Sequence, residues 1–271
     1  MIRLTVVTVA KNACAALQKT MQSVLEQDYG NLEYIVVDGQ STDGSVAHLK
    51  ACSDPRLSWT SEPDGGIFDA MNKGVRRATG QYCLFMNAGD TFVAPDTLSR
   101  MMALAMDGEK KSTDSLKKSA DSLKKSADRK NYPADSFCPS AVPSPDVLYG
   151  DVVKGGSVCP AGEPRNFHRM FYCHQSALVR TASLLDTPFD TSHPYSADIK
   201  QVKQLIKKGR RFLHLPLPVA CFDTGGVSNV HRSRGLMDNM RVVCEVDSPA
   251  DIIRFMPHLL LPWLVCKLRG K

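Results

Sequence analysis

Acidic and amide side chains follow several apolar segments of this 271-residue chain, where they could bind or activate a polar ligand. Asp38 comes directly after the apolar run 33–37, and its carboxylate could accept hydrogen bonds from a nucleobase N–H group or from ribose hydroxyls. Asp43 lies in the Ser- and Thr-containing turn that follows, where a turn and helix-cap role explains it better. We therefore favour a ligand-binding role for Asp38 and a structural role for Asp43.

The segment 85–91, Phe-Met-Asn-Ala-Gly-Asp-Thr, ends another apolar run with the carboxamide of Asn87 and the carboxylate of Asp90. An acid in this place can hold Mg²⁺ or Mn²⁺, and such an ion would neutralise a departing diphosphate. The alternative is that Asp90 caps the helix that follows. Spacing alone leaves both interpretations open.

Two further acids stand near predicted helix starts. Asp64 lies in the loop 62–66, Glu-Pro-Asp-Gly-Gly, which opens a helix whose first N–H groups favour a phosphate. Asn72 lies on a polar face of that helix, and by spacing alone this face is best explained as solvated. Asp198 begins another helix; it could act as a general base, although stabilisation of the helix dipole is the more common role.

The alternation of apolar segments predicts the elements that position these side chains. Strands separated by helices of about ten residues indicate a doubly wound α/β sheet, and its ligands bind at the carboxyl ends of the strands. Thr8, Asp38, Ser61 and the segment 87–90 fall at these ends. The predicted strands are 2–9, 33–37, 56–60 and 82–86, and the predicted helices are 16–26, 45–52, 67–78 and 95–106.

The pattern is interrupted and then resumes. Residues 110–130 repeat a seven-residue unit close to Lys-Lys-Ser-Ala-Asp-Ser-Leu, which we interpret as a tandem expansion in an exposed loop. A strand is then predicted at 147–153, a helix at 196–208, a second strand at 211–215 and a glycine-bearing loop at 222–228. Two helices are expected to finish the chain.

The formal net charge of +6 is unevenly distributed. Residues 107–130 hold eight basic and five acidic side chains, and residues 251–271 hold four basic and one acidic. Each segment contributes +3, so the rest of the chain, its main body, has a net charge of zero. A neutral body is a poor groove for nucleic acid, and no nucleic-acid partner is predicted. The nine cysteines include no Cys-x-x-Cys pair, which indicates reduced thiols in a cytoplasmic protein.

No uninterrupted apolar run is long enough to cross a membrane as a helix. The C-terminal stretch 252–271 mixes apolar and aromatic side chains with terminal cations, which suits docking on an anionic membrane surface. The alternative is a helix that packs on the rest of the protein.

In this order, the motifs resemble those of family 2 glycosyltransferases with the GT-A fold, specifically the colanic-acid-type polysaccharide transferases. The segment 61–74, Ser-Glu-Pro-Asp-Gly-Gly-Ile-Phe-Asp-Ala-Met-Asn-Lys-Gly, carries the resemblance most specifically. The other matching segments are 35–44, 75–80, 85–90, 174–175, 196–198 and 225–228. The implied fold is α/β, a Rossmann-like and mostly parallel sheet flanked by helices, with a C-terminal helical tail.

The resemblance implies inverting transfer of a sugar from a UDP- or GDP-linked donor to a hydroxyl of a glycan or lipid-linked acceptor. The implied setting is the assembly of cell-surface polysaccharide at the inner face of the cytoplasmic membrane. Asp198 would be the catalytic base, and Asp90 would hold Mg²⁺ or Mn²⁺. The implied nucleotide-sugar-binding residues are Thr8, Asp38, Asp64, Asn72, Asn87 and Asp90, and those on the acceptor or diphosphate side are His174, Gln175 and Gly226.

The same resemblance implies a division of the chain. Residues 1–106 would form the nucleotide-sugar-binding half, 107–145 an insertion, 146–232 the acceptor-binding half and 233–271 the helical tail. The metal motif offers a single carboxylate where the broader family commonly has several, so a catalytically silent nucleotide- or glycan-binding homologue is the first alternative. A nucleotidyltransferase is a weaker one, because 11–13, Lys-Asn-Ala, is no glycine- and basic-rich phosphate loop.

Overall fold

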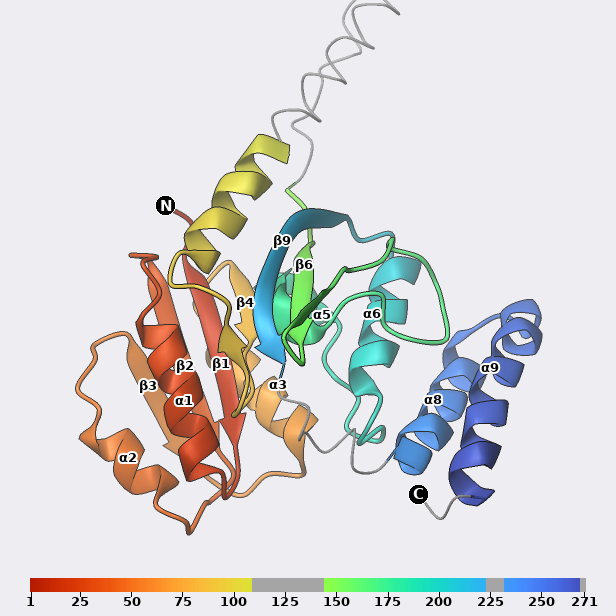
Figure 1. Ribbon diagram of the computed structural model, residues 1–271, viewed down its shortest axis with the longest axis horizontal. Coiled ribbons are helices and arrows are strands. Elements are labelled where there is room, and N and C mark those ends of the chain that lie inside the picture. Colours follow the sequence, from red (N-terminus) through yellow and green to blue (C-terminus); the bar gives the residue numbers. More distant parts are fainter. Residues whose placement is uncertain (109–143, 223–231, 269–271) are drawn as a thin grey trace, which may run out of the picture.

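The computed structural model describes residues 1–108, 144–222 and 232–268 (Figure 1). These residues build one nine-stranded sheet in the order β3-β2-β1-β4-β8-β6-β9-β5, with β7 paired to β6. The repeat 110–130 and the glycine-bearing segment 225–228 lie outside the described residues, so the predicted insertion and Gly226 are not placed.

The first half of the sheet is parallel, as the alternation of strands and helices predicts. Every residue of β1 is buried, because helices cover both faces of the sheet, and this explains its continuous apolar sequence. The strands are β1 (Leu4–Ala10), β2 (Leu32–Asp38), β3 (Leu57–Ser61) and β4 (Tyr82–Phe85), all in parallel register. The helices between them are α1 (Cys14–Leu25), α2 (Ser45–Ala51) and α3 (Ile67–Arg77).

The second half of the sheet is mixed. β8 (Ala177–Arg180) runs antiparallel to both β4 and β6 (Val147–Lys154), whereas β9 (Phe212–Phe222) is parallel to β6. The short strands β5 (Thr91–Phe92) and β7 (Ser157–Cys159) pair antiparallel with β9 and β6. The sheet is therefore parallel over β3-β2-β1-β4 and mixed beyond β4. The sequence predicts a mostly parallel sheet, and the structure differs from this prediction in the second half.

The strand β9 continues well past residue 215, at which the predicted strand 211–215 ends. Pro216 and Pro218 lie where the register with β6 shifts, and such a bulge needs no ladder N–H group from proline. Gly150 of β6 faces this bulge: a Cβ there would lie 2.6 Å from the Leu217 carbonyl oxygen. Glycine at this position allows the close approach of the two backbones.

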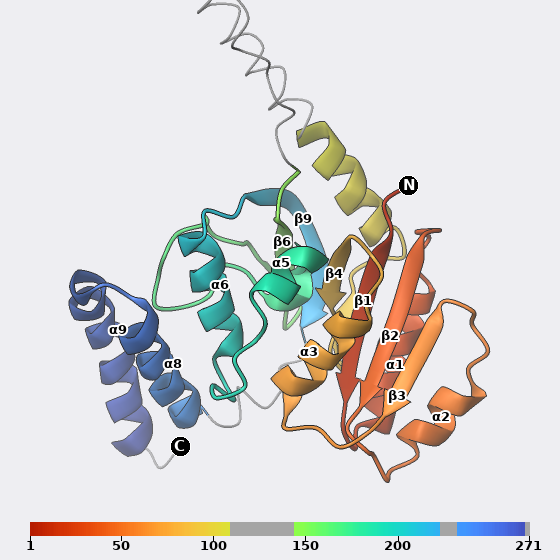
Figure 2. The same ribbon diagram turned by 180° about the vertical axis from the view of Figure 1, so that it is seen from behind.

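Two apolar layers hold the helices against the sheet. The first layer packs α1, α2 and a helix over 97–108 on one face. The second packs α3, α5 (Thr181–Asp186) and α6 (Ala197–Lys207) on the other (Figure 2). The helix α3 lies especially close to β1, because a Cβ at Gly74 would lie 2.4 Å from Val7 Cγ1.

The chain ends in a helical hairpin of α8 (Arg232–Val246) and α9 (Pro249–Leu268), which packs beside α6 (Figures 1 and 2). Val243, Phe255 and Leu259 form its small core. A buried ion pair at 2.6 Å joins Lys203 of α6 to Asp247 in the turn between the two helices. None of the described helices is long and apolar enough to cross a membrane.

The loop that follows β7 also contacts α9 through a pair of stacked imidazoles. The His168 and His258 rings lie 5.0 Å apart and nearly parallel. Burial lowers the pKa of His168 from 6.5 to about 4, and the neighbouring His258 adds to the effect. Folding therefore favours the neutral ring of His168.

We expect this stack to make stability dependent on pH. Between pH 6.5 and 4 the unfolded chain binds a proton at His168 that the folded chain does not, so the free energy of unfolding falls as the pH is lowered through this window. For a partly exposed ring the loss is about 1 kcal/mol. Thermal unfolding at pH 7 and pH 5 measures it, and His168→Phe should show a smaller fall in Tm than the wild type. Equal falls in both proteins would contradict the prediction.

Candidate active site

A cavity of about 510 Å³ opens at the carboxyl ends of β1 and β4 and reaches the start of α6. It brings together six of the residues that the sequence predicts for the site. Parallel strand ends converge at one edge of the sheet, and η1 (His174–Ser176) and α6 face that edge. The six residues are Asp64, Asn87, Asp90, His174, Gln175 and Asp198.

A tight turn after β4 positions Asn87 and Asp90. The Asp90 N–H group donates to the Asn87 carbonyl oxygen, and Gly89 adopts a φ of 105°, which a glycine tolerates in this kind of turn. The Thr20 hydroxyl of α1 donates to the Asp90 carbonyl oxygen at 2.7 Å and fixes the turn. The Asp90 carboxylate is only 4 % exposed and accepts a 2.9 Å hydrogen bond from Gln175 Nε2.

His174 links this turn to Asp198. Its Nε2 atom lies 3.0 Å from Asn87 Nδ2, and its Nδ1 atom lies 3.5 Å from Asp198 Oδ2. An amide nitrogen can only donate, so Nε2 accepts and the ring proton is on Nδ1, facing Asp198. The arrangement holds the Asp198 carboxylate at the cavity with an adjacent N–H donor and leaves it able to accept a proton.

The donor set around Asp90 fits a hard divalent cation. Asn87 Oδ1 is buried and finds no hydrogen-bond partner among the described residues. Together with the Asp90 carboxylate it offers oxygen ligands, which Mg²⁺ and Mn²⁺ prefer, while phosphate oxygens and water would complete the shell. The residues present therefore fit the predicted metal at Asp90.

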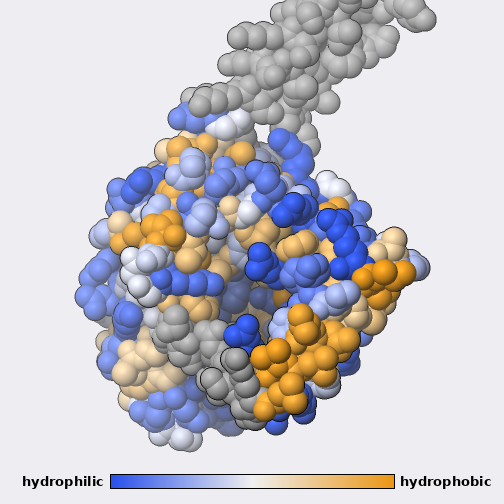
Figure 3. Space-filling view, turned by 45° about the vertical axis from the view of Figure 1, so that its right-hand side comes forward, coloured by the Kyte–Doolittle hydropathy of each residue, from blue (hydrophilic) through white to orange (hydrophobic). Residues whose placement is uncertain are grey.

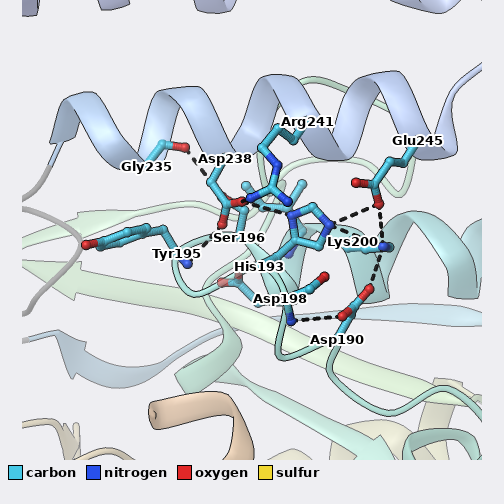
Figure 4. A network of polar contacts seen from close by, with 12 residues as sticks. Asp190, His193, Tyr195, Ser196, Asp198, Lys200, Gly235, Asp238, Arg241 and Glu245 are labelled. Atoms are coloured by element: carbon cyan, nitrogen blue, oxygen red, sulfur yellow. Dashed lines mark hydrogen bonds and ion pairs between the residues drawn. The ribbon is translucent and has the colours of Figure 1, made fainter. Parts of the chain in front are cut away.

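A second group of potential ligands, outside the cavity, is already neutralised. One ligand atom each from Asp190, His193 and Glu245 lies within 4.8 Å of the others. Lys200 Nζ donates to Asp190 and to Glu245 at 2.6 Å each, so an ammonium group supplies the positive charge there (Figure 4). This cluster is better explained as a polar network than as the metal site.

Asp38 ends β2 in a fully buried position close to the cavity. Its Oδ2 atom accepts hydrogen bonds from the Ser41 N–H group and the Ser61 hydroxyl, while Oδ1 has no partner within the described parts of the chain. Asp64 packs against the next residue: a Cβ at Gly39 would lie 2.3 Å from Asp64 Oδ2. Asp38 itself does not line the cavity, and its Oδ1 atom is a buried acceptor without a partner among the described residues.

The structure does not bring Thr8 and Asn72 to the cavity. Thr8 is buried, where its hydroxyl donates to the Met86 carbonyl oxygen and accepts from Tyr34. Asn72 exchanges two hydrogen bonds with the backbone of Phe189, which ties α3 to the loop before α6. Both side chains satisfy internal partners that are distant in sequence, and no sequence pattern reveals such partners.

Other residues that the motifs do not single out also line the cavity. Lys11 follows β1 directly and brings a positive charge, while Tyr195 and Phe222 add aromatic walls. Proximity to a strand end is the only sequence signal for Lys11. Tyr195 lies three residues before Asp198, and its role becomes visible only when the elements are assembled.

Solved structures with the same architecture define the class of fold. The chain is similar to the mannosyltransferase PcManGT from Pyrobaculum calidifontis in complex with GDP-Man and Mn²⁺, with a TM-score of 0.64 and 19 % identity over 95 % of this chain and 70 % of that one. It is also similar to S. aureus TarS 1–349 in complex with UDP, with a TM-score of 0.60 and 16 % identity over 97 % and 71 %. The fold is that of the GT-A glycosyltransferases.

Within that class, residues 5–132 match the model of glycosyl transferase family 2. An uncharacterized glycosyltransferase of Mycobacterium tuberculosis is 43 % identical over 96 residues, which are 35 % of this chain and 37 % of the relative. The PGL/p-HBAD biosynthesis glycosyltransferase of Mycobacterium bovis is 38 % identical over 106 residues, 38 % of this chain and 41 % of the relative. The matched segments span less than half of these relatives.

Proposed function

We propose that this protein is an inverting glycosyltransferase that moves a sugar from a nucleoside-diphosphate donor to an acceptor hydroxyl. The observation that carries the proposal is the convergence of Asp198, His174, Asn87 and Asp90 in one cavity of a GT-A fold. A base and a cation-binding carboxylate on one cavity are the groups that such a transfer needs.

The positions of the carboxylates support the following reaction. Asp198 Oδ2 takes the proton of the acceptor hydroxyl as the oxygen forms a bond to the anomeric carbon. The bond from that carbon to the diphosphate oxygen breaks on the opposite side, its electron pair leaves with the nucleoside diphosphate, and the anomeric configuration inverts. His174 orients the base through its Nδ1–H group. A cation held by Asp90 and Asn87 would neutralise charge on the leaving diphosphate.

Buried polar groups beside the cavity support a nucleotide donor. Asp38 Oδ1 is a buried acceptor with no partner among the described residues, and a nucleobase N–H group would satisfy it. Lys11 adds a cation on the cavity wall for the diphosphate. Two similar solved structures are in complex with GDP-Man and with UDP, which supports a UDP- or GDP-linked sugar as the donor class.

The release of nucleoside diphosphate tests the proposal. Purified full-length protein is incubated with a panel of UDP- and GDP-sugars, a lipid-linked acceptor and Mn²⁺ or Mg²⁺, and the product linkage is determined by NMR. We expect release with one donor, inversion at the anomeric carbon and loss of activity with EDTA. Nucleotide binding without turnover of any donor would instead support a catalytically silent homologue.

We further propose that the acceptor is lipid-linked and that the protein contacts the inner face of the cytoplasmic membrane during synthesis of surface polysaccharide. The hairpin of α8 and α9 buries one apolar face and exposes another (Figure 3). Ile253, Leu261 and Leu268 are 76 %, 67 % and 87 % exposed, and the cations Arg254 and Lys267 lie on the same helix. Exposed apolar side chains with nearby cations suit an anionic lipid surface.

Polar replacements on α9 should release the protein from membranes. Each leucine buried in the lipid interface contributes about 1–2 kcal/mol, so Leu261→Gln with Leu264→Gln should weaken binding to anionic vesicles at least about tenfold. Co-sedimentation with phosphatidylglycerol-containing vesicles measures the binding. Leu185→Gln, at a 54 % exposed leucine on α5, is the matched control and should bind like the wild type. Unchanged binding of the double variant would refute the membrane contact.

A further inference from the structure

We propose that Asp238 of α8 is a positioning residue for Asp198, so that the C-terminal hairpin completes the active site. This inference rests on the proposed function, because it assigns to α8 the placement of the catalytic base. The network involved joins α8 to the segment before α6, and Figure 4 draws it together with Asp198. None of Asp238, His193 and Glu245 is a predicted site residue.

The carboxylate of Asp238 holds the turn that leads into α6. It is 4 % exposed; its Oδ1 atom lies 2.9 Å from His193 Nδ1, and its Oδ2 atom accepts the Tyr195 N–H group at 3.0 Å. Both partners belong to the segment 193–196, immediately before α6, and Asp198 is the second residue of that helix. One side chain from α8 therefore fixes the backbone just before the base.

The opposite side of the His193 ring is fixed as well. Its Nε2 atom lies 3.0 Å from Glu245 Oε2, also on α8, and Lys200 of α6 donates to both Glu245 and Asp190. The Lys200 ammonium holds the pKa of Asp190 and of Glu245 below their ordinary values, so both carboxylates stay ionised near neutral pH. Figure 4 shows these side chains pointing toward one another between α6 and α8.

Such a network affects the position of the segment 193–196 more than it affects the stability of the fold. Burying charged groups costs about as much as their mutual attraction returns, and only one arrangement satisfies every partner. The segment also carries Pro194 and Tyr195, which line the cavity together with Asp198. A displacement of about 1 Å at a reacting group can lower a rate by about 10²-fold, so the position of this segment matters for transfer.

A second link between α6 and the hairpin provides a matched control. Lys203 and Asp247 form a buried ion pair at 2.6 Å, but Lys203 lies more than one turn beyond Asp198 along α6. Breaking this pair loosens the hairpin without touching the segment before α6. A general loss of stability and a specific loss of positioning can therefore be separated.

The experiment compares Asp238→Asn with Asp247→Asn in the full chain. An amide has one acceptor oxygen, so Asp238→Asn cannot accept from both His193 and the Tyr195 N–H group. We expect kcat to fall about 10- to 100-fold with the donor KM and the Kd of the nucleoside diphosphate within twofold of the wild type. Asp247→Asn should lower Tm but keep kcat within twofold, and hydrogen exchange at the Tyr195 amide should rise only in Asp238→Asn.

A double variant shows whether Asp238 acts through the base. If it does, Asp238→Asn should cause no further loss of kcat when Asp198→Asn is already present. An unchanged kcat in Asp238→Asn, or an equal loss in the Asp198→Asn background, would overturn the inference. If Asp238→Asn does not fold, Glu245→Gln serves instead, because it perturbs His193 from the exposed side of the network. This variant should lower kcat and leave the donor KM unchanged. An unchanged kcat in Glu245→Gln would overturn the inference.

Failure of the proposed function gives a different result. A wild-type protein that turns over no donor contradicts the transferase proposal by itself. Hydrogen exchange then tests the positioning role of Asp238 without any turnover. Unchanged exchange at the Tyr195 amide in Asp238→Asn overturns this role, and faster exchange supports it.

Discussion

Replacing Asp198 by asparagine should reduce sugar transfer about 10²- to 10⁴-fold, the range expected when a general base is lost. The substitution preserves size but removes the negative charge and the ability to accept a proton. His174 and its contact with Asn87 remain in place, and the turn that carries Asp90 is unchanged. The chemical step should therefore suffer while donor binding does not.

Two measurements separate these effects. The kcat is obtained from the release of nucleoside diphosphate at saturating donor, and calorimetry gives the Kd of the nucleotide, which should stay within twofold of the wild type. Asp96→Asn is the control, because Asp96 is an exposed acid whose nearest ion-pair contact, with Arg100, is 3.9 Å long. Residual transfer above a tenth of the wild-type rate, or a parallel loss of nucleotide affinity, would contradict the role of Asp198 as base.

Asp90→Asn should lower kcat/KM at least about 100-fold and weaken the response to added metal. The variant keeps an oxygen that can accept from Gln175, but it removes the negative charge on which cation binding depends. The metal concentration that gives half the maximal rate should therefore rise sharply. Mn²⁺ binding followed by electron paramagnetic resonance in the presence of UDP or GDP measures the same loss without turnover.

The polar network behind Asp198 offers the control for this prediction. Glu245 belongs to the other group with metal-ligand spacing, where Lys200 already supplies a cation. Glu245→Gln should leave the metal concentration for half-maximal rate unchanged, whatever it does to kcat. If instead Glu245→Gln shifts the metal response and Asp90→Asn does not, the cation binds at the network and not in the cavity.

The site combines one carboxylate with one carboxamide where the resemblance leads one to expect more acids. Asn87 accounts for part of this difference, because it performs two tasks in one side chain. Its nitrogen contacts His174, and its buried oxygen has no partner among the described residues. A second carboxylate at position 87 could not donate to His174, so in the proposed reaction the amide links the cation-binding side to the base.

The sequence by itself determined the local elements and the residues at their ends. The strands of the parallel half and the helices between them follow from apolar patterning, because each is a short segment whose periodicity reflects its own burial. Asp64, Asn87 and Asp90 could be chosen because parallel strands bring their carboxyl ends to one edge. That rule depends on element order, which a sequence shows directly. Asp198 begins a helix and is predicted only through the family resemblance.

The tertiary structure alone decided which polar groups face a ligand and which face the protein. Thr8 and Asn72 look like site residues by position, yet they bond to Met86 and Phe189, the latter 117 residues from Asn72. The strand β8 and the length of β9 depend on pairing partners, because a four-residue run or a proline-containing run gains hydrogen bonds only inside the assembled sheet. His193 and Asp238 likewise meet across 45 residues. A buried polar atom is satisfied by whichever partner the fold brings to it, and that partner leaves no periodic signal in the chain.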